Sequence, residues 1–348
     1  MKSKLKYLNI LFLIIGIAVF VIIIRKAGTA RLWEEVRAVG TGIVFIVLFP
    51  VTWTLLNTIG WYTALGSSRK KVRFSKLLIV RQAGEALNYI IPSGYMGGEP
   101  IKAHLIRDEL SMSQSLASVI IAKTTQTIAQ LMYFLIGIVF ALFMIDISFS
   151  MKVSFVSAML LLGGGLFIFS VLQQNGIFSI FLSLTRKIGI GKTLFQNMDD
   201  KARRVDDHIK RLYREDRTYF LLSILVHFAG WLFGIMEIRL IMFLLGEQIT
   251  WGQSFFAATL TSLASASGFF IPGSLGAFEL GHFYVFKLVG LDPSVGLALG
   301  ILRRVRELAW VGIGLAFFFI LGGTAFIRKK TKPESGESSP LMQPTETP

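Results

Sequence analysis

The sequence contains no cysteine in 348 residues, which excludes disulfide bonds, thiol catalysis and cysteine-based metal sites. Histidine is also scarce, with four in the chain. His104 and His282 have no metal-ligand spacing, and His227, in an apolar stretch, is expected to be a hydrogen-bonded core residue. We therefore expect no metal site and no cofactor. The sequence also shows no nucleophile–base arrangement, phosphate-binding loop or dinucleotide-binding fingerprint, so we do not expect an enzyme.

Acidic residues are few as well, since 21 Asp and Glu stand against 36 Lys and Arg and leave a net charge of +15. A basic balance can indicate nucleic-acid binding. Here the basic residues lie mostly between apolar segments, where they are typical of topology determinants that contact anionic lipid head groups. We therefore expect membrane lipids with anionic head groups, and no nucleic acid, as partners.

Apolar residues, in contrast, make up 53% of the chain, against about 45–50% in typical soluble domains. A helix needs about 20 mostly apolar residues to cross a bilayer. The sequence predicts an all-α polytopic membrane helix bundle with about six full spans, a single membrane domain over residues 1–330 and a disordered cytoplasmic tail over 331–348. The longest apolar runs lie at 10–24, 43–65, 131–145, 153–172, 219–235 and 311–327.

The loops between these spans alternate in charge. The N-terminus and the loops at 69–76, 186–217 and 328–332 are rich in Lys and Arg, whereas the links at 146–152 and 246–251 are nearly neutral. Because positive loops face the cytoplasm, this pattern predicts a multi-pass plasma-membrane protein with both termini in the cytoplasm. Residues 25–37 place basic charge on the other side, and their helical spacing of apolar residues favours an interfacial helix.

Two further apolar segments, at 77–110 and 253–290, are each interrupted by Pro and Gly. The first contains NYIIPSGYMGGEPIKAHLIR (88–107), and the second contains GFFIPGSLGAFELGHFYVFK (268–287). Aligning their Ile-Pro pairs sets an offset of 180 (272 − 92), which continues without a gap into the spans that follow. This predicts an internal repeat with units at about 42–145 and 219–322. The matched polar pairs are Glu99 with Glu279, Lys123 with Arg303, and Gln126 with Arg306.

The two broken segments enter the membrane from opposite sides in this topology, so the repeat units are predicted to be inverted, as in secondary transporters. A backbone break is tolerated in a membrane only where protein or water covers it, which favours re-entrant hairpins. Half-helices that start at the breaks direct free N–H groups toward an anion. The alternative of kinked full spans gives eight crossings. The break and half-helix-start positions are Pro92, Gly94, Gly97, Gly98, Glu99, Pro272, Gly273, Gly276 and Glu279.

Charged residues recur at helical spacing in the spans that follow the breaks. An ionised group at the bilayer centre costs about 2.5–3.5 kcal/mol, so these residues require a wet cavity, a partner or a ligand. Their excess of Arg and Lys suits a phosphate. The predicted head-group-binding residues are Lys123, Gln126, Arg303, Arg304, Arg306 and Glu307, and the predicted cavity-lining residues are Arg81, Glu85, Asn88, Glu237 and Arg239.

Several of these residues have a structural alternative. Arg303 and Glu307 are four residues apart and can form an internal ion pair, as can Arg81 and Glu85. Glu99 and its repeat mate are open to three roles: helix capping, proton coupling or catalysis as a carboxylate pair. Their place at the start of half-helices favours capping.

The segments GEALNYIIPSGYMGGEPIKAHLI and FIPGSLGAFE, the latter followed by a span with LRRVRE, resemble the transmembrane region of lysylphosphatidylglycerol synthases, also called the flippase-like domain family. The resemblance covers about residues 5–328. It implies a bacterial or archaeal plasma-membrane protein that moves a lipid between leaflets. Bifunctional members of the family carry a synthase domain after the membrane part. Here a short polar tail follows instead, so aminoacyl transfer is not expected and the lipid is not identified.

Taken together, these features predict a flippase-type transporter for an anionic or amphiphilic lipid, such as a glycerophospholipid or a polyprenyl-phosphate-linked lipid. Two alternatives remain open. One is an integral-membrane enzyme acting on a lipid-linked substrate, and the other is a non-catalytic partner of a separate lipid-modifying enzyme. A homo-oligomer is also compatible with the sequence.

Overall fold

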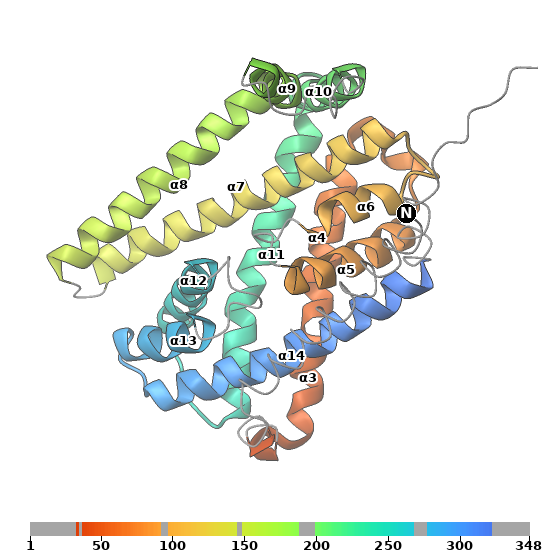
Figure 1. Ribbon diagram of the computed structural model, residues 1–348. Coiled ribbons are helices and arrows are strands. Elements are labelled where there is room, and N and C mark those ends of the chain that lie inside the picture. The colour runs from red at the N-terminus through yellow and green to blue at the C-terminus, as the bar shows by residue number, and fades with distance from the viewer. Residues whose placement is uncertain are drawn as a thin grey trace, which may run out of the picture.

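Helices make up nearly all of the chain that the computed structural model describes, and this part contains no strand (Figure 1). The described residues are 33–34, 37–91, 97–144, 148–187, 199–267 and 277–321. Within them, the predicted all-α helix bundle is confirmed. The predicted first span at 10–24, most of the segment at 25–37, the tail, and the breaks at Pro92, Gly94, Pro272, Gly273 and Gly276 lie outside the described residues.

The helices form two series with a connecting group between them. The first series is η1 (Gly40–Gly42), α3 (Ile43–Leu48), α4 (Pro50–Ala64), η2 (Gly66–Lys71), α5 (Phe74–Ile90), α6 (Glu99–Leu105) and α7 (Met112–Met144). The connecting group is α8 (Phe149–Asn175), α9 (Ile177–Lys187) and α10 (Asp199–Arg214). The second series is α11 (Arg217–Leu244), α12 (Trp251–Ser267), α13 (Ala277–Leu288) and α14 (Pro293–Ile320).

The two series match element by element. The apolar segment Arg37–Ala64, which includes α3 and α4, and helix α11 each have 28 residues, and they start 180 positions apart (217 − 37). Helices α5 and α12 each have 17 residues. Helix α7 begins at Met112 and α14 at Pro293, within one residue of the same offset. The offset that aligns the sequence segments therefore also aligns the helix boundaries.

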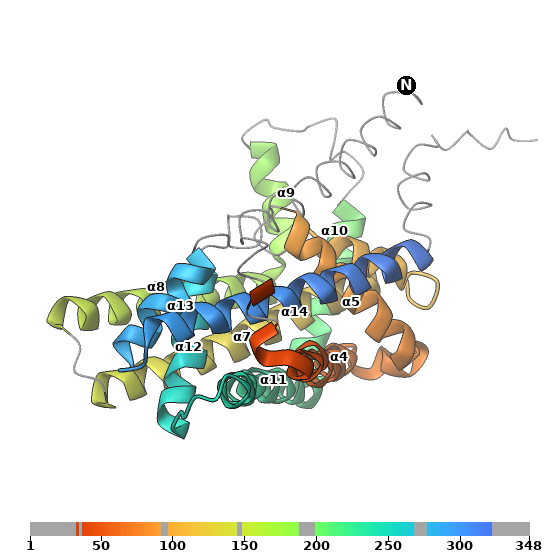
Figure 2. The same ribbon diagram turned by 90° about the horizontal axis from the view of Figure 1, so that it is seen from below.

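Corresponding helices run in opposite directions. In Figure 1, α7 begins beside α6 and runs toward α8, whereas α14 begins beside α13 and runs back past α5. Likewise, α4 ascends in this view and α11 descends beside it. In the view from below, α7 and α14 again lie with their starts at opposite ends (Figure 2). Helix α11 packs along α4, and α14 packs along α5, so the main helix contacts join the two series.

Four helical segments are long and apolar enough to cross a membrane, among the described residues: Arg37–Ala64, Met112–Phe140, Lys152–Asn175 and Arg217–Leu244. They correspond to four of the predicted spans. Helix α14 has sufficient length with 28 residues, but its charges at 303–307 make it too polar by composition. Helices α6 and α13 have 7 and 12 residues, or about 10 and 18 Å, which is too short for a hydrocarbon layer of about 30 Å.

Small residues allow these helices to approach one another closely. A Cβ at Gly60 would lie 2.4 Å from the ring of His227, where α4 meets α11. A Cβ at Gly98 would lie 2.0 Å from the backbone oxygen of Gly84, where α6 meets α5. Since lipid tails are as apolar as the helices, close packing of this kind is a main source of stability in membranes.

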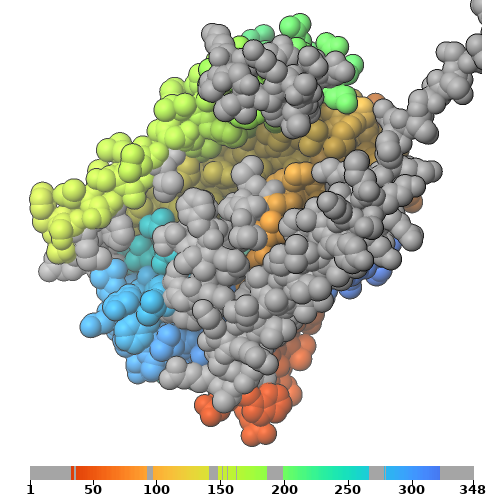
Figure 3. Space-filling view, in the orientation of Figure 1, coloured from red at the N-terminus to blue at the C-terminus, as the bar shows by residue number. Residues whose placement is uncertain are grey.

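The connecting group lies at the edge of the bundle. The most apolar stretch of α8 contains no buried residue. In the space-filling view the flank of this helix forms the upper left edge of the molecule (Figure 3). Helix α10 buries Val205, Ile209 and Leu212 on one face and carries its exposed charges on another. Its Asp206 accepts hydrogen bonds from the backbone N–H groups of Phe178 and Ser179, which caps the start of α9.

Replacing Gly98 with alanine tests the contact between α5 and α6. Gly98 has right-handed helical backbone angles (φ −81°, ψ −17°), which alanine adopts without strain. The added methyl group must therefore separate two backbones, and we expect the free energy of unfolding to fall by about 1–3 kcal/mol. The measurement is thermal unfolding of the purified protein in detergent, followed by tryptophan fluorescence.

The matched control is Gly312→Ala in α14, where a Cβ meets no atom within 4 Å. We expect this variant to be unchanged or slightly more stable, because alanine is the better helix former. Equal unfolding temperatures for the two variants would show that the α5–α6 contact does not need glycine.

Candidate functional site

A cavity of about 1090 Å³ lies between the two series of helices. One part of its wall is polar and comes from α4, α5, α7, α11 and α14. Another part is apolar and comes from α8 and α9, including Leu166, Phe169, Phe178 and Phe181. Both repeat units therefore contribute charged side chains to one cavity, and part of the wall of this cavity is apolar.

The first ion cluster, on α5, α6 and α7, consists of Arg81, Glu85, Glu99, Lys102 and Lys123. The Lys102 ammonium lies 2.7 Å from Glu85 Oε1 and 3.0 Å from Glu99 Oε1, so it holds both carboxylates. Lys123 Nζ lies 3.7 Å from Glu99 Oε1, and an Arg81 guanidinium nitrogen lies 3.8 Å from Glu85 Oε1. The predicted Arg81–Glu85 pair is therefore present. Three cations and two anions give this cluster a formal charge of +1.

Asn88 holds the turn between α5 and α6 in place. Its amide donates to Glu99 Oε1 at 2.9 Å, and its carbonyl oxygen accepts from the backbone N–H of Gly98 at 2.7 Å. Glu99 is the first residue of α6, as predicted, but no side chain caps this helix by a hydrogen bond. The Glu99 carboxylate instead accepts hydrogen bonds from Asn88 on α5 and from Lys102 on α6, and it lies 3.7 Å from the ammonium of Lys123 on α7.

The second ion cluster, on α11 and α14, consists of Glu237, Arg303, Arg304, Arg306 and Glu307. Arg303 donates to Glu237 Oε2 at 2.7 Å, and Arg306 donates to Glu237 Oε1. Arg304 lies 3.1 Å from Glu307 Oε2, and Arg306 lies 3.5 Å from Glu307 Oε1. The side chain of Glu237 is 1% exposed, so its charge is stabilised almost entirely by the two arginines.

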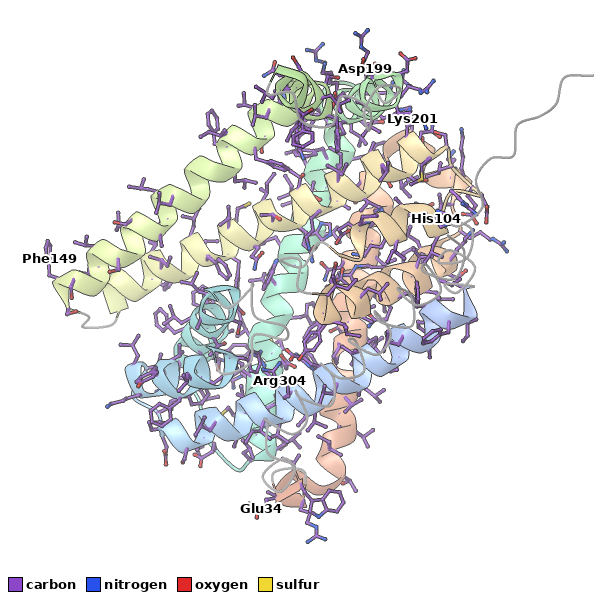
Figure 4. All side chains as sticks on the ribbon, viewed as in Figure 1. Glu34, His104, Phe149, Asp199, Lys201 and Arg304 are labelled. Carbon is purple, nitrogen blue, oxygen red and sulfur yellow. The ribbon has the colours of Figure 1, made fainter. Side chains whose placement is uncertain are left out.

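Aromatic residues complete the second cluster and link it to the first series. Tyr89 on α5 accepts from Arg304 at 2.6 Å and contacts Glu307 Oε2 at 3.3 Å. The Arg304 guanidinium also stacks 4.5 Å from the Phe278 ring, and Arg306 stacks 4.7 Å from Trp53. In Figure 4, Arg304 lies on α14 at the centre of the molecule, far from the labelled peripheral residues such as Phe149.

The offset of 180 relates the two clusters in part, through the repeat mates Lys123 and Arg303. Gln126 and Asn57 share a hydrogen bond of 3.4 Å in the first series, and their repeat mates Arg306 and Glu237 form an ion pair in the second. The mate of Lys102 is His282, which lies 3.4 Å from Arg303. The same scaffold therefore carries an amide pair in one series and a salt bridge in the other.

Most of the predicted site residues meet at the cavity. Arg304 is buried beside the wall, Asn88 lies behind Glu99, and the side chain of Glu279 lies outside the described residues. Those that line the cavity are Arg81, Glu85, Glu99, Lys123, Gln126, Glu237, Arg303, Arg306 and Glu307.

The structure places two of the expected features differently. Arg239 is not among the described residues that line the cavity; it donates to the backbone oxygen of Ile249 at 2.9 Å and stacks on Trp251. The pair expected between Arg303 and Glu307 is replaced, because Glu237 on another helix reaches Arg303 and leaves Glu307 to Arg304 and Arg306.

His227 is a hydrogen-bonded core residue, as predicted. Its Nδ1 lies 2.8 Å from the backbone oxygen of Ser223.

Sequence reasoning missed Lys102, Asn57, Tyr89 and Trp53. Lys102 lies inside the motif that was aligned, and Asn57 lies 180 positions before Glu237. Applying the offset to every charged membrane residue would have identified Asn57. Nothing in the sequence points to Tyr89 or Trp53, because aromatic residues are frequent in this chain, with 30 Phe, 8 Tyr and 6 Trp.

Replacing Glu237 with glutamine tests the coupling of the second cluster. The change leaves Arg303 and Arg306 buried without their shared carboxylate, and breaking a buried pair in this way costs about 3–5 kcal/mol. We expect the double variant Glu237→Gln/Arg306→Gln to be no less stable than Glu237→Gln, because one of the stranded charges is removed as well. Thermal unfolding in detergent of the wild type, both single variants and the double variant measures the coupling.

Strictly additive losses in this cycle would show that the two residues do not interact.

Comparison with known proteins places the chain in a family. The family profile described as lysylphosphatidylglycerol synthase TM region matches residues 9–330. A UPF0104 membrane protein of Methanothermobacter thermautotrophicus is 20% identical over 331 residues, covering 86% of this chain and 91% of its own. A UPF0104 membrane protein of Pyrococcus horikoshii is 25% identical over 331 residues, covering 89% and 96%. No solved structure matches. The chain is therefore a membrane protein of the lysylphosphatidylglycerol synthase transmembrane-region family.

Proposed function

We propose that this protein binds a membrane lipid with an anionic head group in its central cavity and moves it between the two leaflets. The observation that carries the proposal is the composition of the cavity wall. Charged groups of α5, α7, α11 and α14 line one part, and apolar side chains of α8 and α9 line another. An amphiphile needs such a divided surface, because its phosphate requires cationic donors and its chains require an apolar wall.

The inverted arrangement of the two series supports transport over simple binding. In transporters with inverted repeats, rocking of one unit against the other exposes a central site alternately to each side. The helices α5–α6 and α12–α13 are then re-entrant hairpins, which agrees with the short lengths of α6 and α13. The protein resides in the plasma membrane with both termini in the cytoplasm, as its loop charges favour.

The family comparison supports a lipid as the cargo. The matching family is named after the membrane region of an enzyme that makes a lipid, lysylphosphatidylglycerol. That name does not identify the lipid handled here. The cavity chemistry selects only for an anionic or amphiphilic lipid, such as a glycerophospholipid or a polyprenyl-phosphate-linked lipid.

Transport is tested in proteoliposomes that contain fluorescent phosphatidylglycerol or a polyprenyl phosphate, with dithionite quenching or enzymatic probing of the outer leaflet. We expect the wild-type protein to raise the rate of lipid exchange above that of empty vesicles. Lys123→Gln removes a charged donor from the cavity wall, so we expect the rate to fall by about ten-fold.

Lys70→Gln is the matched control, because Lys70 is exposed in η2 and lies outside the residues that line the cavity. No exchange above empty vesicles with either lipid would refute the proposal. Chemical conversion of the lipid, lost in Glu99→Gln while lipid binding persists, would favour an enzyme instead. Inactivity alone together with capture of a lipid-modifying enzyme would favour a partner role.

A further inference from the structure

Among the residues that form the two ion clusters, only Lys123 and Arg303 are repeat mates, and the residues around them differ at several positions, one of which lies on α4 and α11. In the second series, the long helix α11 supplies a carboxylate, Glu237, to the cations of α14. In the first series, the equivalent residue on α4 is the amide Asn57, and it faces Gln126. The first cluster therefore has no carboxylate at the position where Glu237 pairs with the arginines of the second cluster.

The second cluster also carries a formal charge of +1 and leaves Arg303 Nε buried without a hydrogen-bond partner, but its arginines have closer carboxylate partners than Lys123 and Arg81 have. Each of its three arginines lies within hydrogen-bonding reach of a carboxylate, and the two that hold Glu237 have side chains that are only 8–9% exposed. Tyr89, Phe278 and Trp53 cover the guanidinium groups further. A ligand that bound here would have to displace an ion pair that is already made, which opposes binding.

The first cluster is satisfied only in part. Lys102 makes the two short contacts to the carboxylates, at 2.7 and 3.0 Å. Lys123 and Arg81 approach the same carboxylate oxygens only at 3.7 and 3.8 Å, beyond a good hydrogen bond. The side chain of Lys123 is 27% exposed and lies on the cavity wall. Lys123 is therefore held next to open space. Arg81 also lines the cavity, although its side chain is only 9% exposed, and the carboxylate contacts of both cations are long.

The space beside these donors is polar and small. A void of about 20 Å³, enough for one water molecule, is bounded by Arg81, Lys123, Asn57 and Gln126 among others. The same four side chains also line the large cavity, which provides the room that a phosphate requires. Every one of them can donate hydrogen bonds.

We propose that the phosphate of the ligand binds to the first cluster, between Lys123, Arg81 and Gln126, in the place that the Glu237 carboxylate takes in the second series. The second cluster is then a structural clasp between α11 and α14 and not a head-group site. This inference rests on the proposed function for the source of the anion, a lipid rather than a free phosphate.

The decisive variant is Asn57→Glu, which installs in the first series the carboxylate that the second series already has. Its charge neutralises Lys123 internally, so we expect the affinity for dihexanoyl phosphatidylglycerol to fall by about ten-fold or more, the loss of a charge-assisted contact. Asn57→Gln is the neutral comparison at the same position, and we expect it to lose less affinity than Asn57→Glu does. Binding is measured by calorimetry on purified protein in detergent.

A second set of variants keeps the test independent of how Asn57→Glu folds. We expect Lys123→Gln to weaken binding by about ten-fold while the unfolding temperature without ligand stays near the wild-type value. Arg306→Gln is expected to lower the unfolding temperature and to affect affinity less than Lys123→Gln does. Arg239→Gln, which removes a cation of α11 away from the cavity, is expected to leave affinity unchanged.

The choice of probes separates the sources of the anion. We expect phosphatidylglycerol to bind more tightly than inorganic phosphate, with both weakened by Lys123→Gln, because the apolar wall adds affinity for the chains. Equal affinity for inorganic phosphate and phosphatidylglycerol would overturn the lipid as source. Equal affinity for phosphatidylglycerol and phosphatidylcholine, insensitive to Lys123→Gln, would overturn the anion site.

Failure of this inference is distinguishable from failure of transport. Transport that depends on Arg306 but not on Lys123 would overturn the inference and leave the proposed function standing. Phosphatidylglycerol binding that depends on Lys123, in a protein that moves no lipid, would do the opposite.

Discussion

The contact between Glu237 on α11 and the arginines of α14 is the interaction on which the second series depends. A charge in the membrane interior is costly, and α14 carries three arginines within four positions. Arg304 pairs with Glu307 on α14 itself, whereas Arg303 and Arg306 share Glu237, which lies on a helix far away in the sequence. The burial of these two arginines therefore requires α11 beside α14. The clasp therefore joins the first helix of the second series to its last one.

The clasp also joins the two series. Tyr89 and Trp53 belong to the first series, yet they contact Arg304 and Arg306 of the second. Close packing adds to this link, since a Cβ at Gly314 on α14 would lie 2.5 Å from the backbone oxygen of Gln82 on α5. Polar contacts and small residues thus both act between α14 and α5. The polar contacts determine which helices meet, and the small residues determine how closely they approach.

The repeat explains how one scaffold holds two different polar centres. Equivalent backbones place residues 57 and 126 of the first series as they place 237 and 306 of the second. The amides of the first pair carry no charge, and this is why we propose an external anion there, whereas the opposite charges of the second pair neutralise each other.

Much of the fold was predictable because hydropathy and helix breaks are local properties of the chain. The apolar runs located the four described segments that are long and apolar enough to cross a membrane, and the constant offset located the repeat. Ion-pair partners were less predictable. The spacing of Arg303 and Glu307 favours an ion pair within α14. In the structure Arg303 instead pairs with Glu237 on α11, at 2.7 Å.

The sequence by itself determined that this is an all-α membrane protein, that its two halves repeat with an offset of 180, and that charges lie within its membrane segments. These properties follow from composition and spacing, which need no tertiary contact. Only the tertiary structure decided which charges neutralise one another and which face the cavity. The reason is that partners such as Glu237 and Arg303, or Tyr89 and Arg304, lie on helices whose approach depends on the packing of the whole bundle.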